Sequence, residues 1–329
     1  MTQIAATSTD ASTTPVTRSR FRRFVAPSAM IGLLLLELVV FSMLAPDTFP
    51  TAVNFRAVAA NQAILGLLTL ALLVPLIAGE FDASLAAVLT VSSLTSASLM
   101  SNANWPLWAA IATALCASTV LGLVNGLIVV KLGVNSLVTT LGMFTVLTGL
   151  ITGLAEGRTI SSGLPTETLA RFANPIFGIP LPVCYLLIVA TVVWYVTERT
   201  PLGRHWQAIG SSVPSARLAG LKTDRLRVMA FVAGGFLAGI AGIVQLFKAG
   251  LGTPNIGPNL LFPAFAAAFL GAAAFRLGSF NVRGSMVSIF LLAFGVVGLI
   301  MIGAPYWVDQ IFTGTALVLS LALVRVLRQ

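Results

Sequence analysis

Charged side chains are scarce in this chain of 329 residues: Asp, Glu, Lys and Arg make up 9% of it, and hydrophobic residues make up 57%. A soluble globular domain carries about 25% charged residues, so this chain has too few to cover a surface in water. Apolar runs of about 20 residues recur along it, the length of a helix that crosses a bilayer. The runs do not alternate apolar with polar residues as the strands of a membrane barrel do. We therefore predict an all-α, polytopic membrane protein.

Residues that build metal and redox sites are also nearly absent. The chain has a single histidine, His205, and two cysteines, Cys116 and Cys184, both within apolar runs. This excludes a histidine-rich proton relay or metal site, and no metal site is expected. We find no catalytic Ser–His cluster and no G-x-x-x-x-G-K-[ST] phosphate loop. We expect a protein that is not an enzyme and has no cofactor of its own.

Ten apolar segments are candidates for membrane spans. The segment 83–100 is rich in Ser and Thr and could be re-entrant, and the segment 261–275 is short and could kink at Pro263. The ten segments are residues 24–44, 57–78, 83–100, 107–130, 134–153, 180–197, 228–247, 261–275, 284–303 and 308–325.

The basic residues predict the orientation of these spans. With a cytoplasmic N-terminus, only Arg56, Arg158, Arg171 and Lys248 of the 19 Lys and Arg residues lie on the outside. Cytoplasmic segments of membrane proteins are enriched in Lys and Arg, so we expect ten spans with both termini in the cytoplasm. The net charge of +9 then reflects orientation and does not indicate nucleic-acid binding.

The N-terminal residues divide into a tail and a first span. Residues 1–23 are rich in Ser and Thr, end in basic residues, and are expected to form a disordered cytoplasmic tail. The apolar run 24–44 exceeds the 7–15 residues of a signal peptide's hydrophobic region, so we interpret it as a retained span. Residues 24–329 are expected to form a single transmembrane domain.

The longest basic, polar segment lies on the predicted cytoplasmic side, at residues 198–227. Within it, SSVPSARLAG predicts a short helix, since Ser212 can cap it, Pro214 suits a first turn and Gly220 can end it. So short a helix is marginal alone in water and usually docks on another surface. The alternative is a basic loop that rests on anionic lipid headgroups.

Two acids, Glu80 and Asp82, lie between spans in the sequence IAGEFDAS. Ionisable groups at membrane depth are costly and are usually paired or functional. They could hold a turn together through caps, line a solute path, or bind a coupling proton or cation.

Other side chains at membrane depth are candidates for a pathway or for packing. The amides of Asn61 and Asn125 could join helices or meet a polar solute, and we favour the first role. The rings of Phe265 and Phe269 could form an apolar gate or pathway wall, although such aromatics more often pack in a core.

Five blocks, in order along the chain, resemble sugar-type permease subunits of bacterial ABC importers, the ribose, arabinose and xylose group. TPLGRHWQAIGSSVPSARLAGL is similar to the central loop of that family, and AGEFDASLAA is similar to its G-G-I-D-L-S-V-G signature. The other blocks are LVNGLIVVKLGVNSLVTTLGM, GPNLLFPAFAAAFLGAAAF with GSFNVRG, and GAPYWVDQIFTGTALVLSLAL. Glu80 replaces the second glycine of the signature, and Ala273 and Ala274 stand where the family often has Thr-Ser.

The resemblance implies a transmembrane permease in the bacterial inner membrane that imports a monosaccharide or related polyol. It implies a separate ATPase subunit that holds ATP-Mg, a solute-binding protein, and a second permease chain, identical or different. The loop 198–227 would couple the permease to the ATPase. The matching loop positions proposed for this coupling are Gly203, Arg204, Gly210, Ala216, Arg217, Leu218 and Gly220.

A second function remains open from the sequence. Ten spans also suit a secondary transporter driven by an ion gradient, with Glu80 and Asp82 as the coupling site. Copurification separates the two, because an importer subunit brings down an ATPase and a secondary transporter does not.

Overall fold

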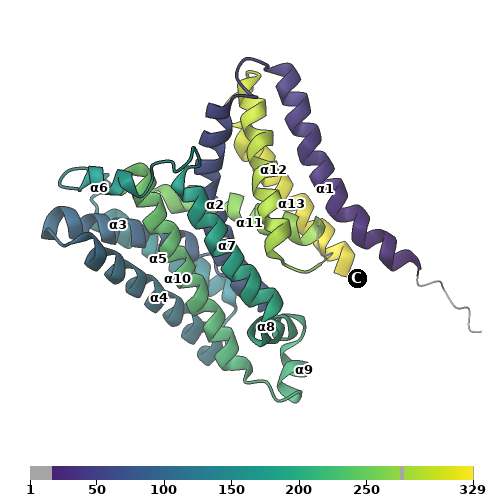
Figure 1. Cartoon of the computed structure of the whole chain (residues 1–329). Helices are drawn as coiled ribbons and strands as arrows, with labels where there is room; N and C mark the ends of the chain where they lie inside the picture. Colours follow the sequence, from purple (N-terminus) through teal and green to yellow (C-terminus); the bar gives the residue numbers. More distant parts are fainter. Residues whose placement is uncertain (1–16, 275–277, 329) are drawn as a thin grey trace, which may run out of the picture.

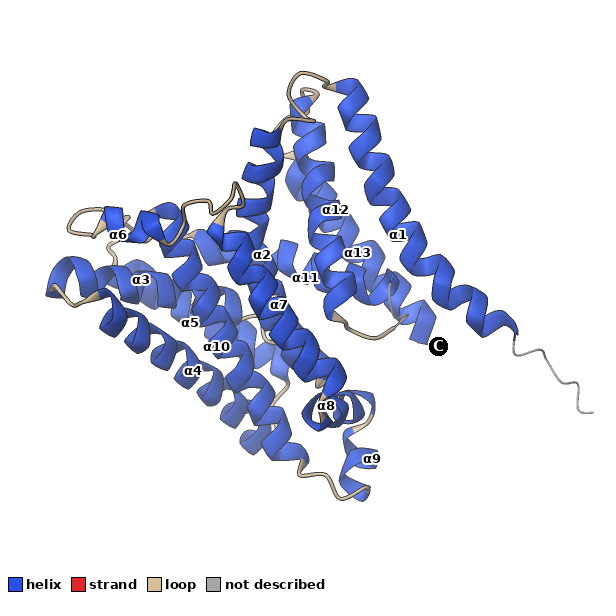
Figure 2. Cartoon of the chain, viewed as in Figure 1, coloured by secondary structure: helices blue, strands red, loops and turns tan. Residues whose placement is uncertain are grey.

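The computed structural model describes residues 17–274 and 278–328, and over these ranges the chain is helical (Figure 2). Thirteen helices are described, of which α6, α8 and α9 are short. Their bounds are α1 Thr17–Leu44, α2 Ala52–Ile77, α3 Leu85–Ala103, α4 Leu107–Leu132, α5 Ser136–Leu154, α6 Thr166–Arg171, α7 Leu181–Arg199, α8 Pro201–Ser211, α9 Val213–Leu218, α10 Thr223–Ala249, α11 Ile256–Ala274, α12 Val282–Met301 and α13 Val308–Arg328.

The all-α, polytopic fold class is confirmed. Within the described ranges, nine helices from α2 onward are long and apolar enough to cross a membrane. The tenth predicted span falls on α1, whose apolar portion is Ser28–Leu44. This helix begins at Thr17, earlier than the predicted span, and residues 1–16 of the predicted tail lie outside the described residues.

Two predicted spans differ in detail from the structure. The Ser- and Thr-rich segment forms a full helix, α3, and some of its hydroxyls bond within the bundle, as when Ser92 donates to the Gly239 carbonyl at 2.8 Å. The short span around Pro263 is part of a longer helix, because α11 begins at Ile256. Pro263 lies inside that helix.

The helices form two groups with α2 between them (Figure 1). One group contains α3, α4, α5 and α10, and the other contains α1, α11, α12 and α13. Every residue of α2 from Ala63 to Ile77 is buried. A helix that is apolar on all sides suits either lipid or a protein interior, so it is the packing of the other helices around it that gives α2 its central position.

Small residues allow the helices of the first group to pack closely. Gly235 of α10 faces α4, and a Cβ added there would lie 2.5 Å from the Ser118 carbonyl oxygen. Gly122 of α4 lies against the same surface of α10. Such contacts between small residues join membrane helices by van der Waals packing.

Both ends of the described chain lie on the side of the bundle that carries α8 and α9, whereas α6 lies on the opposite side (Figure 1). A chain with both ends on one side crosses the bundle an even number of times. The arrangement therefore agrees with ten crossings and places the segment 198–227 at one end of the bundle.

Candidate functional site

The basic segment 198–227 contains two short helices, α8 and α9. The predicted helix is confirmed as α9: Ser212 caps it by accepting a hydrogen bond from the Ser215 amide, and Gly220 follows with a positive φ of 83°. The helix α8 was not predicted from the sequence. Its signal was present, because Thr200 caps the helix and Pro201 occupies its first position.

The helix α8 packs on the ends of two long helices. The Trp206 Nε1 donates to the Leu226 carbonyl at 2.9 Å, and the Gln207 Nε2 donates to the Thr197 carbonyl at 3.1 Å. Gly203 lies against the end of α7, where an added Cβ would be 2.2 Å from the Thr197 oxygen. α8 is therefore anchored to both α7 and α10.

A glycine contact brings α8 onto the turn between α2 and α3. Gly210 faces the end of α2, and an added Cβ would lie 2.1 Å from the Ile77 carbonyl oxygen. On the turn itself, Gly79 has a φ of +84°, a conformation that glycine adopts without steric cost. The two backbones approach closely because neither position carries a side chain.

The helix α9 projects beyond α8 and is held by one arginine. The guanidinium of Arg217 donates to Asp224 Oδ1 at 2.9 Å and to Thr223 Oγ1, at the start of α10. Ala216 is buried beneath the helix, while the Leu218 side chain is 91% exposed. Arg204 on α8 is also exposed. α9 thus presents an apolar side chain away from the bundle.

The acid Glu80 is paired. Its Oε1 accepts from the Arg227 Nε of α10 at 2.5 Å, and the two side chains are 8% and 20% exposed. From the sequence, Arg227 belongs to the basic segment and has no predicted partner. The two residues lie 147 positions apart in the chain, so no local pattern connects them.

The second acid, Asp82, caps the turn. Its Oδ1 accepts from the Ser84 amide at 3.1 Å and from the Ser84 hydroxyl at 2.5 Å, and Asn125 donates to that hydroxyl at 2.6 Å. Burial raises the pKa of Asp82 to about 7, against the lowering effect of the Ser84 hydrogen bonds. The structure therefore brings Asp82 and Asn125 into one buried network.

Of the remaining candidates, Asn61 lies apart from the others. It is exposed on the N-terminal half of α2, and its Oδ1 accepts from the Lys248 ammonium of α10.

Among the described residues, no group of three His, Cys, Asp or Glu side chains is placed to hold a metal ion.

The rings of Phe265 and Phe269 belong to an aromatic cluster that also contains Phe81 and Phe280. Phe81 stacks on Phe269 with ring centroids 6.0 Å apart, and Phe280 meets Phe269 edge-on at 5.1 Å. Phe81 lies between the two acids on the α2–α3 turn. Phe81 lies in the sequence AGEFDASLAA, but without the fold nothing distinguished it from a packing residue.

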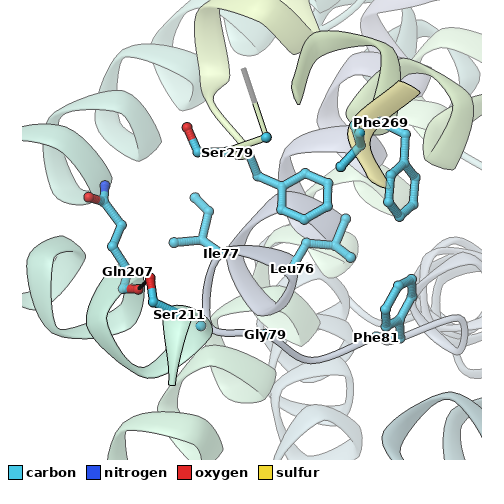
Figure 3. Close-up of a pocket in the computed structure, with 12 residues that line it drawn as sticks. Leu76, Ile77, Gly79, Phe81, Gln207, Ser211, Phe269 and Ser279 are labelled. Atoms are coloured by element: carbon cyan, nitrogen blue, oxygen red, sulfur yellow. Dashed lines mark hydrogen bonds between the residues drawn. The ribbon is translucent and has the colours of Figure 1, made fainter. Parts of the chain in front are cut away.

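Next to the cluster lies a cavity of about 570 Å³ (Figure 3). It is bounded by the end of α2, the α2–α3 turn, α8 and the connection that precedes α12. Phe81 and Phe269 lie on one side of it, and Gln207 and Ser211 of α8 lie on the other (Figure 3).

Comparison with known proteins gives a consistent match. Residues 54–321 match the family described as the permease component of branched-chain amino acid transport systems. The ribose import permease protein RbsC of Haemophilus influenzae is 28% identical over 83% of this chain and 84% of its own length. The autoinducer 2 import system permease protein LsrD of Photorhabdus luminescens is 30% identical over 76% of each chain. The D-allose transport system permease protein AlsC of Escherichia coli is 26% identical over 90% of each chain.

Proposed function

Because the chain belongs to the family of permease components of branched-chain amino acid transport systems, we propose that it forms the membrane path of an ATP-driven importer for a monosaccharide or related polyol. Membership makes the protein a multi-pass permease subunit in the bacterial inner membrane, whose ATP hydrolysis belongs to a separate subunit. The resemblance found in the sequence is thereby confirmed.

The solute class rests on the relatives. Although the family description mentions branched-chain amino acids, three relatives that cover most of this chain are named for ribose, autoinducer 2 and D-allose import. Ribose and allose are compact and rich in hydroxyl groups. We therefore propose a compact polyhydroxy compound of this kind as the solute of this chain.

The surface formed by α8 and α9 is the proposed docking site for the ATPase subunit. Leu218 supplies an exposed apolar contact, and Arg217 fixes α9 on α10 through Asp224. Gly203 and Gly210 let α8 pack closely on the bundle, Ala216 is buried on α9, Gly220 ends α9, and Arg204 adds an exposed positive charge. A docked ATPase could thus move α8 and α9 together.

The remaining partners follow from the same proposal. ATP and Mg²⁺ would bind to the ATPase, and a solute-binding protein would deliver the solute at the side that carries α6. A second permease chain, identical or different, would complete the path. The helix α13 exposes Ile311, Val318 and Leu319, which lipid or this second chain would cover.

The two acids have structural roles in this proposal. Glu80 is neutralised by Arg227, and Asp82 organises the start of α3 through Ser84. A coupling cation at Glu80 would have to compete with a guanidinium at hydrogen-bond distance. This geometry supports the ATP-driven importer over an ion-coupled carrier.

The experiment is copurification of the ATPase with two matched variants. Leu218 and Phe177 are both highly exposed apolar residues, at 91% and 101%, in α9 and in the connection before α7. We expect Leu218→Asp to lower ATPase recovery and transport-stimulated ATP hydrolysis at least tenfold, because a charge replaces the apolar contact. Phe177→Asp should leave ATPase recovery unchanged.

Equal ATPase recovery with both variants would show that α9 is not the docking site. If the wild-type protein recovers no ATPase, and uptake runs on an ion gradient alone, the importer proposal itself is wrong.

A further inference from the structure

Two arginines from different helices share one tryptophan ring at the end of the bundle that carries α8. The guanidinium carbon of Arg199 lies over the Trp194 ring, 5.3 Å from its centre, and that of Arg283 lies 5.2 Å from the same centre. Arg199 is the last residue of α7, and Arg283 is in the first turn of α12. A cation over an aromatic ring is a favourable contact, and here two such contacts bring two positive charges close together.

Neither of these arginines is neutralised by an acid within the part of the chain that the structure describes. The ion pairs between described residues all involve other arginines. Glu198 precedes Arg199, but successive residues of a helix do not face each other. Two like charges held near one another repel, and an anion bound by both removes that repulsion. The pair therefore favours the binding of an anionic group.

The depth of the pair points to the phosphates of lipid headgroups. Trp194 lies about 7.5 Å before the end of α7, at a rise of 1.5 Å per residue. Both guanidinium groups contact its ring, so they lie level with the last turns of α7, whereas α9 projects beyond α8. Tryptophan and arginine are typical of the boundary between hydrocarbon and headgroups. A phosphate of the inner leaflet is therefore better placed to meet the pair than an acidic side chain of a protein docked on α9.

The two arginines also belong to parts of the bundle that have little direct contact. The helix α7 packs mainly on α2 and α8, whereas α12 packs mainly on α1, α2 and α11, and the contact between α7 and α12 is small by comparison. Arg199 is followed by Thr200, which caps α8, so the end of α7 is also the start of α8 (Figure 1). An anion held by both arginines would join α12 to the helix that carries α8.

We propose that Arg199 and Arg283 bind the phosphate group of an anionic phospholipid of the inner leaflet, at the junction of α7 and α12. Arginine suits this ligand, because its planar guanidinium donates several hydrogen bonds to phosphate oxygens. The acyl chains would follow the lipid-facing side of α7, where Val192 and Tyr195 are exposed. This lipid would steady the end of α7 from which α8 begins, whichever solute the protein imports.

The test is native mass spectrometry of the full-length permease, titrated with phosphatidylglycerol or with phosphatidylcholine of the same acyl chains. Each basic residue near an anionic lipid surface strengthens binding about fivefold. We expect wild type to bind phosphatidylglycerol at least tenfold more tightly than phosphatidylcholine. The double variant Arg199→Gln, Arg283→Gln should lose most of this preference. Arg225→Gln is the matched control, because Arg225 is exposed near the start of α10, and its loss should leave the preference unchanged.

A second pair of measurements separates charge from folding. The double variant Arg199→Lys, Arg283→Lys keeps both charges but loses the planar guanidinium groups, so it should retain part of the preference. Phosphatidylglycerol should raise the melting temperature of wild type and leave that of the glutamine double variant unchanged. In phosphatidylcholine the two proteins should melt at similar temperatures.

Equal affinity of wild type for the two lipids would overturn the proposal, and so would a glutamine double variant that keeps the full preference. If inorganic phosphate at the same concentration displaces phosphatidylglycerol from wild type, the site takes a free anion and the lipid assignment is wrong. If the glutamine double variant binds phosphatidylglycerol normally but recovers no ATPase, the arginines contact that subunit instead. These binding measurements do not require transport, so a failure of the import function would be recognised separately.

Discussion

At the scale of single residues, the two acids of the α2–α3 turn have different environments. Glu80 has a guanidinium partner, whereas Asp82 is fully buried and depends on hydrogen bonds from Ser84. The Asp82 Oδ2 accepts no hydrogen bond from the described residues. An ionised carboxyl in such a place is costly, and this cost explains why burial raises the pKa of Asp82 to about 7.

Asp82 predicts a pH dependence of stability. Its folded pKa of about 7 lies above the ordinary value of 3.8, so the folded protein holds more protons than the unfolded chain between these values. Its contribution therefore favours the folded state less as pH rises from about 4 to about 7, and levels off above that. We expect Asp82→Asn to remove this component, so that the variant gains stability relative to wild type between pH 5 and pH 8.

Thermal unfolding in detergent at several pH values measures this difference. The exposed acid Asp47 offers a control, since Asp47→Asn removes the same charge at the surface. Parallel pH profiles for wild type and Asp82→Asn would contradict the prediction. ATP-driven uptake should survive in Asp82→Asn, whereas a carrier that binds its coupling proton at Asp82 would lose transport.

At the scale of elements, α8 connects the exposed helix α9 to the bundle. Its apolar side chains Trp206 and Ile209 are buried, and its close contacts are made at Gly203 and Gly210. α9 has little contact of its own with the long helices, apart from the start of α10 where Arg217 holds it. α9 is therefore joined to α2 by two routes, through α8 and through its arginine on α10.

At Gly210, where α8 contacts the end of α2, we expect replacement by alanine to destabilise the protein, although alanine normally stabilises a helix. Alanine stabilises a helix by about 1 kcal/mol relative to glycine where there is space. Gly142 on α5 has no neighbouring atom within 4 Å of an added Cβ, so Gly142→Ala should be neutral or stabilising. At Gly210 the added carbon would meet the Ile77 carbonyl, so Gly210→Ala should lower the melting temperature and reduce ATP-driven uptake several-fold.

Melting temperatures and uptake rates of the two variants, side by side, decide this point. If Gly210→Ala is as stable and as active as Gly142→Ala, α8 can move away from the turn without consequence. The Gly79–Gly210 contact would then transmit nothing.

At the scale of the whole molecule, the position of α8 and α9 defines the inner side. The ends of the described chain lie on this side, and the connection between α6 and α7 lies on the other (Figure 1). The excess of Lys and Arg predicts that this side faces the cytoplasm.

Thiol labelling of intact cells tests the orientation. In a background with Cys116→Ala and Cys184→Ala, a membrane-impermeant thiol reagent should label Phe177→Cys and leave Lys222→Cys unlabelled until the cells are opened. Both positions are exposed, so accessibility differs only by side. Labelling of Lys222→Cys from the medium would reverse the topology and remove the docking site from the cytoplasm.

Much of this architecture could be predicted because a bilayer constrains sequence strongly. Long apolar runs must become helices, basic residues gather on one side, and a Ser–x–Pro cap with a following glycine marks α9. The helix α8 was also within reach, since Thr200 and Pro201 carry a start signal.

The sequence by itself determined the helical, polytopic membrane fold, predicted an even number of crossings and marked the basic segment as an exposed element. Only the tertiary structure decided that Glu80 meets Arg227, that Gly210 seats α8 on the turn, and that Phe81 joins the rings of α11. The physical reason is distance along the chain. Hydropathy and capping act within a few residues, whereas these pairs are far apart in sequence and come together only when α2 is enclosed by the other helices.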